Sequence, residues 1–165
     1  TSMFGERDRM FDDYIRAVDT ALYICGGEVV EIASRCRRIM VPDINVIASN
    51  LYFENGASCY VVGSWTSGRR IFRVNMHAPG ICGEVEPEKE AFIYAEGDYE
   101  GVRFDSKEIA GSNELYVYGG FQRKSREFID SIISGKEETT SPFSDALKTM
   151  EVCETILAQA QIRGV

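Results

Sequence analysis

The chain has 165 residues, of which 44% are hydrophobic and 27% are charged, and its net charge is -8. This composition is typical of a globular protein large enough to bury a core, and it excludes a disordered or fibrous chain. No apolar run approaches the ~20 residues of a membrane span, and the start of the chain lacks the apolar segment of a secretory signal. We therefore expect a cytoplasmic protein with no membrane partner. Because the charge is acidic and basic residues are dispersed, we expect no nucleic-acid partner either.

The chain contains five cysteines, Cys25, Cys36, Cys59, Cys82 and Cys153. Their number is odd, they are widely scattered, and they form no C-x-x-C pair. We expect them to be reduced thiols, several of them in the core. With a single histidine in the chain, a metal site is not expected.

Residues 11–27, FDDYIRAVDTALYICGG, predict a helix with a narrow polar stripe. At ~100° per residue, the stripe contains Asp12, Arg16, Asp19 and Tyr23. Nearly all other positions are apolar, and Gly26-Gly27 suits the helix end. Such a stripe is either the solvated face of the helix or the wall of a polar cleft.

Residues 28–37, 45–53, 57 to about 66 and 69–76 alternate as strands do, and shorter runs follow at 81–88, 91–97 and 100–105. Asn55-Gly56 favours a type I′ hairpin turn between the second and third runs. Because the connections are short and not helical, the strands are predicted to form an antiparallel meander.

Two helices follow the strands. The first ends at Gly135 and carries Phe121, Phe128, Ile129, Ile132 and Ile133 at helical spacing. The second starts at Ser141-Pro142, and its predicted buried stripe is Ala146, Met150, Cys153, Leu157 and Ala160. The order predicts an α+β fold, an open-faced, mostly antiparallel sheet with helices packed on one face. The other face, with Tyr52, Tyr60, Trp65 and Phe72 or their alternating neighbours, is too apolar for water and predicts a homo-oligomer through the sheet.

Other candidate sites are weaker. Neither nucleotide-binding glycine motif, G-x-G-x-x-G or G-x-x-x-x-G-K-[ST], occurs. The single histidine, His77, and the serines Ser64 and Ser67 lack the motif of a serine hydrolase. Arginines 69, 70 and 73 are either strand-edge charges or a site for an anionic or hydroxylated ligand.

Three segments together resemble the C-terminal domain of the Gfo/Idh/MocA oxidoreductases, the family of glucose-fructose oxidoreductase and inositol dehydrogenase. They are IRAVDTALYICGGEVVEIASR, LYFENGASCYVVGSW followed by SGRR, and FIDSIISGKEETTSPFSDALKTMEVCETIL. The resemblance covers about residues 11–160, in the family's order and spacing. It implies that residues 1–165 form a single domain, the substrate-binding and oligomerising part of an NAD(P)-dependent sugar or polyol dehydrogenase.

The resemblance also implies site residues. Asp12 and Asp19 match the carboxylates of the family's D-x-x-x-H-x-x-D motif, and Arg16 stands where the family commonly has its catalytic histidine. Asp12 and Arg16 thus take the catalytic positions, and Asp19 and Tyr23 are candidates for substrate contacts. Arginine stays protonated, so it cannot be a general base, although it can orient a hydroxyl or carboxylate.

The family's Rossmann domain and the lysine after its E-K-P motif have no counterpart in these residues. We therefore expect part of a longer oxidoreductase, in which NAD(P) binds to the full-length protein and not to this chain alone. The chain alone is then expected to be inactive. A non-catalytic binding or assembly module with the same fold remains the alternative.

Overall fold

A computed structural model describes residues 9–162, and it confirms the predicted α+β class. The chain forms two compact units. The first unit contains the chain up to Gly68 and again from Ser141, and the second runs from Arg69 to Thr140. No helix in the described part is both long and apolar enough to cross a bilayer.

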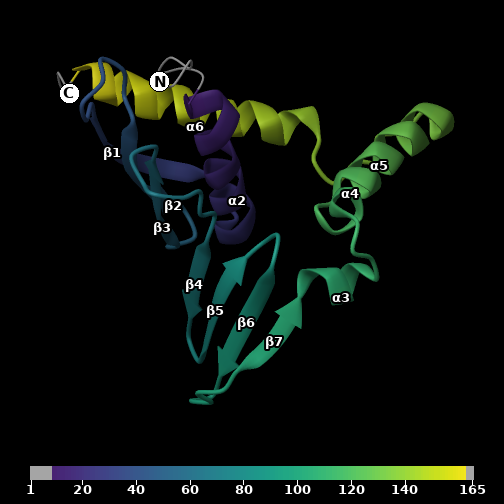
Figure 1. The fold of residues 1–165 in the computed structure, drawn as a ribbon. Coiled ribbons are helices and arrows are strands. Elements are labelled where there is room, and N and C mark those ends of the chain that lie inside the picture. The colour runs from purple at the N-terminus through teal and green to yellow at the C-terminus, as the bar shows by residue number, and fades with distance from the viewer. Residues whose placement is uncertain (1–8, 163–165) are drawn as a thin grey trace. The chain divides into compact units, whose positions relative to one another are not determined.

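The first unit packs two helices on a three-stranded antiparallel sheet of order β1-β2-β3 (Figure 1). Its elements are the π-helix η1 (Arg9–Tyr14), α2 (Ile15–Cys25), β1 (Val29–Arg37), β2 (Val46–Phe53), β3 (Ser58–Ser64) and α6 (Phe143–Ile162). The inner face of β2 is fully covered, since Ile47, Ser49, Leu51 and Phe53 alternate with more exposed residues. These side chains meet Met10, Tyr14, Val18 and Ala21 of the helices and the buried residues of α6.

The buried stripe of α6 begins later than the sequence predicts. Cys153, Leu157 and Ala160 are buried as predicted, and Ile156 is buried with them. Ala146 and Met150, however, are exposed. The reason is that α6 first meets the core at Thr149, which is buried beside α2.

The turn at residues 54–56 differs from the predicted type I′ hairpin. That turn needs positive φ at two positions, but only Gly56, with φ of 84°, has it. The amide of Gly56 donates to Phe53 O and the amide of Phe53 donates to Ala57 O, each over 3.0 Å. The result is a three-residue loop with glycine in the left-handed position. Its Asn55 Nδ2 donates to the carbonyls of Cys25 and Gly26 over 2.9 and 3.2 Å, so the hairpin also caps the end of α2.

The second unit is a four-stranded antiparallel sheet of order β4-β5-β6-β7, followed by three helices. Its elements are β4 (Val74–Ala78), β5 (Ile81–Glu86), β6 (Glu90–Ala95), β7 (Val102–Asp105), α3 (Ser106–Ala110), α4 (Leu115–Tyr118) and α5 (Phe121–Ser134). All pairings are antiparallel between neighbours in the sequence, as the predicted meander requires. The meander is divided into two sheets, because residues 69–73 lie outside the strands.

The two faces of the β4–β7 sheet differ sharply in polarity. Strand alternation and register place on one face Val74, Met76, Ile81, Gly83, Val85, Ala91, Ile93, Val102 and Phe104, which we name the apolar face. The opposite face carries Asn75, His77, Cys82, Glu84, Phe92, Tyr94 and Arg103. Val102 remains 57% exposed, and among residues 9–160 every fully buried hydrophobic side chain lies in the first unit. The second unit therefore has no enclosed core of its own.

Helix α5 is amphipathic and ends at Gly135, as predicted, with Gly135 in the left-handed conformation. Its apolar side chains remain largely exposed, with Phe128 at 65% and Ile132 at 66%. Like the apolar face of the sheet, this helix lacks a complete covering within the unit.

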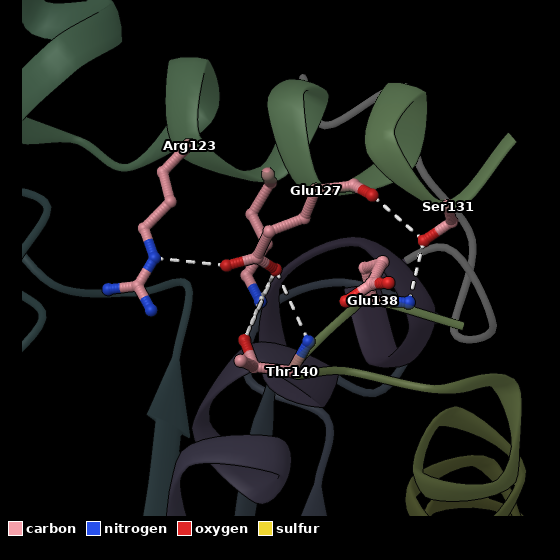
Figure 2. Close-up of polar contacts among 6 residues, drawn as sticks. Arg123, Glu127, Ser131, Glu138 and Thr140 are labelled. Carbon is pink, nitrogen blue, oxygen red and sulfur yellow. Dashed lines mark hydrogen bonds and ion pairs between the residues drawn. The ribbon is translucent and has the colours of Figure 1, made fainter. Parts of the chain in front are cut away.

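The opposite side of α5 binds the chain segment that follows it (Figure 2). Glu127 accepts hydrogen bonds from the amide and hydroxyl of Thr140, each over 3.2 Å, and pairs with Arg123 and Lys124. One turn later, Ser131 Oγ accepts from the amide of Glu138 over 2.8 Å. Two helix side chains thus bind two alternate amides of the segment that follows the helix.

Candidate functional site

The polar stripe predicted from the sequence begins in unusual helix geometry. Asp12 lies in the π-helical η1, whereas Arg16, Asp19 and Tyr23 lie in α2. π-helical turns are rare and occur frequently at functional sites. Tyr14 and Val18, on the other side of the same helices, are buried, and this anchors the stripe to the core.

Arg16 is held between two carboxylates. Its Nε donates to the carbonyl of Asp12 over 2.8 Å. Its terminal nitrogen lies 3.4 Å from Asp12 Oδ1 and 3.4 Å from Asp13 Oδ1. The side chains of Asp12 and Arg16 are 67% and 53% exposed, and such exposed pairs contribute little to stability. The cluster keeps its charges accessible to a ligand.

Asp19 and Tyr23 occupy different surroundings. Asp19 accepts a hydrogen bond of 2.8 Å from the hydroxyl of Thr149, a buried residue of α6. Tyr23 is 86% exposed. The structure thus brings Asp12 and Arg16 into contact, fixes Asp19 against α6 and leaves Tyr23 open to solvent. Within this chain the stripe is an open polar surface and not a closed cleft.

The chemistry available to the stripe is hydrogen bonding. Carboxylate oxygens accept from hydroxyl groups, and a guanidinium donates to hydroxyl or carboxylate oxygens. The guanidinium of Arg16 offers a positive charge and five N–H donors, and it has no acceptor atom. The arrangement suits a small hydroxylated ligand.

The other residues that the sequence analysis considered as sites, among them Arg73, His77 and Ser64, lie in contacts with neighbouring residues of the chain. Arg73 pairs with Glu86 over 2.5 Å, and Lys89 pairs with the same carboxylate. The hydrogen bonds from Lys89 and Arg73 hold the pKa of Glu86 at about 2. His77 lies in β4 opposite Cys82, on the polar face of the sheet. Ser64 bonds Thr66, with 3.0 Å between the hydroxyl oxygens.

One residue of the stripe's surroundings was missed by the sequence analysis. Thr149 lies 130 positions after Asp19, inside a helix whose pattern predicted only apolar contacts. A threonine in a helix gives no sequence signal for a partner on another helix. Only the packing of α2 on α6 reveals this contact.

Comparison with known proteins gives a consistent picture of the fold. No family model matches the chain. No curated protein matches it either. Among solved structures, the dehydrogenase MviM of Clostridium difficile matches with a TM-score of 0.81 at 20% identity, over 95% of this chain and 50% of the other. An aldose-aldose oxidoreductase of Caulobacter crescentus, complexed with glycerol, matches with a TM-score of 0.71 at 18% identity, over 92% of this chain and 45% of the other. A biliverdin reductase of Synechocystis, in complex with biliverdin and NADP+, matches with a TM-score of 0.69 at 15% identity, over 89% of this chain and 45% of the other.

The chain thus has the fold of a dehydrogenase-type domain. This is the fold implied by the resemblance to the Gfo/Idh/MocA oxidoreductases, and that expectation is confirmed. The chain spans about half the length of the structures that it matches.

Proposed function

We propose that this chain is the substrate-binding and oligomerising C-terminal part of an NAD(P)-dependent sugar or polyol oxidoreductase. In the full-length protein a Rossmann domain binds NAD(P), and the polar stripe of α2 supplies substrate contacts. The observation that carries the proposal is the accessible cluster of Asp12 and Arg16 on a helix whose other side is buried.

The resemblance to the Gfo/Idh/MocA oxidoreductases implies the sugar or polyol class of substrate, and the chemistry of the stripe is compatible with it, whereas the fold alone does not select a substrate. Similar folds occur in an aldose-aldose oxidoreductase and in a biliverdin reductase, so the fold is compatible with quite different substrates. A stripe of two carboxylates, a guanidinium and a phenol is suited to several hydroxyl groups at once. Asp12 and Arg16 are assigned to the reacting hydroxyl, and Asp19 and Tyr23 to the remainder of the substrate.

A non-catalytic binding or assembly module is the second candidate, and one observation favours it. Arg16 stands where the resemblance implies a histidine base, and its charge is already balanced by Asp12 and Asp13. In that case the stripe binds a hydroxylated ligand without hydride transfer. The fold and the ligand class are then the same, and only the chemistry differs.

Two experiments test these candidates. The isotope-labelled chain is titrated with aldoses and polyols, and we expect the amide signals of residues 12–23 to shift. Asp12→Asn and Asp19→Asn should abolish the shifts, whereas Asp130→Asn on α5 serves as a matched control and should not. Absence of shifts with every ligand would contradict the assignment of the stripe.

The second experiment separates enzyme from binding module. The chain is joined to a Rossmann half and assayed for NAD(P) reduction with the same panel. Activity supports the enzyme. Binding without activity, restored by Arg16→His, supports the module.

We further propose that the apolar face of β4–β7 binds the same face of a second copy of this chain. A sheet must bury at least one face to be stable, and the second unit lacks an enclosed core. A two-fold axis brings identical patches together, so one apolar face is sufficient for a dimer. Of the residues that the sequence analysis assigned to an interface, Tyr52 and Tyr60 in the first unit are exposed within this chain, whereas Trp65 packs against the core. Phe72 lies outside the strands.

A further inference from the structure

The side chain of Asn55 joins the β2–β3 hairpin to the end of α2, the helix that bears the polar stripe. Its Nδ2 donates to the carbonyls of Cys25 and Gly26 over 2.9 and 3.2 Å. Its Oδ1 accepts from the amide of Ala57 over 3.0 Å. Asn55 is exposed at the tip of the hairpin, and no other asparagine in the chain precedes a glycine.

An Asn-Gly pair is chemically reactive as well as suited to a turn. Asparagine is a thermally labile residue, and glycine has no side chain to hinder attack on its amide. We propose that Asn55 is a site of spontaneous deamidation, and that its contacts with the end of α2 control the rate. The proposal is independent of the proposed oxidoreductase function, because the reaction needs only Asn55, Gly56 and water.

The reaction proceeds in two steps that balance. The Gly56 nitrogen loses its proton and attacks Asn55 Cγ, a C–N bond forms, and Nδ2 leaves with that proton as ammonia. The product is a succinimide ring. Water then adds to either carbonyl carbon of the ring and breaks the bond of that carbon to the Gly56 nitrogen, which gives aspartate or isoaspartate. One water is consumed, one ammonia is released, and nothing is oxidised or reduced.

The folded structure opposes the first step. The Gly56 amide, which must lose its proton, donates a hydrogen bond of 3.0 Å to Phe53 O. The leaving group, Nδ2 of Asn55, is bound to two carbonyls at the end of α2. Attack at Cγ therefore requires that the tip of the hairpin first separates from the helix. Because such local opening limits the reaction, its rate reports how firmly the hairpin holds α2.

The products weaken the contact that controls their formation. A carboxylate at position 55 has no N–H to donate to the carbonyls of Cys25 and Gly26, and these carbonyls form the negative end of the helix dipole. Isoaspartate also lengthens the backbone by one carbon, which disturbs the hydrogen bond from the Phe53 amide to Ala57 O. Deamidation thus loosens the end of the helix that bears the polar stripe.

The test compares the folded wild-type chain with the same chain unfolded in guanidinium chloride, at one mildly alkaline pH and one temperature. Trypsin then places Asn55 in peptide 39–69. Mass spectrometry follows the mass increase from NH2 to OH, backbone fragmentation assigns it to a residue, and a zero-time sample corrects for modification during digestion. We expect modification at Asn55 and not at Asn45 or Asn50 of the same peptide. The rate should be at least ~10-fold lower in the folded chain.

Two glycine variants test the role of the helix contact. A methyl group at Gly27 would lie 3.3 Å from Asn55 Nδ2, so Gly27→Ala should push the hairpin from the helix and raise the rate in the folded chain several-fold. Gly80→Ala is the matched control, because Gly80 has a similar φ, +76° against +75°, but nothing within 4 Å of the added methyl group. It should leave the rate unchanged. Equal rates in the folded and unfolded wild type, faster modification at another asparagine, or equal effects of the two variants would overturn the proposal.

Discussion

Thr149 of α6 donates a hydrogen bond of 2.8 Å to Asp19 of α2, and the same hydroxyl lies 3.0 Å from the carbonyl of Asp145. The threonine is buried, whereas the carboxylate belongs to the exposed polar stripe. A core contact therefore fixes the orientation of one of the proposed substrate-binding residues. This arrangement makes Asp19 both a structural and a functional candidate, and the two roles can be separated.

Replacement of Thr149 by valine should destabilise the protein and weaken ligand binding through Asp19. Valine fills the same space without a hydroxyl, so the loss is that of one buried hydrogen bond, about 1–2 kcal/mol in the free energy of unfolding. Urea denaturation measures it. Thr155→Val is the matched control, because the Thr155 hydroxyl bonds only the carbonyl of Glu151 at the surface. Equal effects of the two substitutions would refute the special role of Thr149.

The hairpin contact with α2 predicts a pH-dependent defect for Asn55→Asp. The new carboxylate would replace the amide donors that face the carbonyls of Cys25 and Gly26. At pH 7 the loss of these bonds and the repulsion should cost about 1–2 kcal/mol. Below about pH 4 the carboxyl is protonated and donates again, so part of the stability should return.

Thermal unfolding at both pH values measures the effect of this substitution. Asn113→Asp, in the loop before α4, is the control and should change little at either pH. A defect of equal size at both pH values would argue against a capping role for the Asn55 side chain.

The sequence was sufficient for the class of fold because the signals were local. Alternation predicts the strand at 45–53, and helical spacing with a terminal glycine predicts α5 and its end at Gly135. Local signals failed where contacts with distant parts of the chain determine the conformation of a turn or the burial of a side chain. The turn at Asn55 is not of type I′, and the side chain of the same asparagine caps the end of α2. The exposure of Met150 depends on where α6 meets the core.

The site was predicted with similar limits. Helical periodicity placed Arg16, Asp19 and Tyr23 on one side of the helix and left open whether that side meets solvent or a cleft, and all three are exposed in this chain. The π-helical geometry at Asp12 and the contact between Asp19 and Thr149 were not predictable, because both arise from packing against other elements. The roles assigned to these residues remain predictions that rest on the resemblance and on their chemistry.

The Glu127 contacts in Figure 2 predict acid-sensitive ordering of residues 138–140. Hydrogen bonds from Lys124, and then from the Thr140 amide, lower the pKa of the Glu127 carboxyl from 4.5 to about 2. Because the pKa of Glu127 is lower in the folded than in the unfolded state, the ionised carboxylate stabilises the folded state at pH values above 4.5. This contribution is lost as the pH falls from 4.5 towards 2. The amide of Thr140 should therefore exchange slowly at pH 6 and progressively faster, relative to the intrinsic rate, in that window.

Two variants test the contributions of the α5 side chains Glu127 and Ser131 separately. Glu127→Gln should accelerate exchange at Thr140 and remove its pH dependence. Ser131→Ala should accelerate exchange at Glu138, whose amide bonds the serine hydroxyl, and leave the pH response of Thr140 in place. If both variants affect both amides equally, the segment opens as one unit and the separate contacts do not control it.

A charge placed on the apolar face of β4–β7 should dissociate the proposed dimer. Val102→Lys introduces an ammonium group that must be buried without a partner, which should weaken association at least ~10-fold. Asn75→Lys is the matched control, because it adds the same charge to the opposite face of the same sheet. Sedimentation at several protein concentrations should give dimers for the wild type and for Asn75→Lys, and monomers for Val102→Lys. A wild-type monomer at micromolar concentration, or a reversed pattern of the two variants, would place the interface elsewhere.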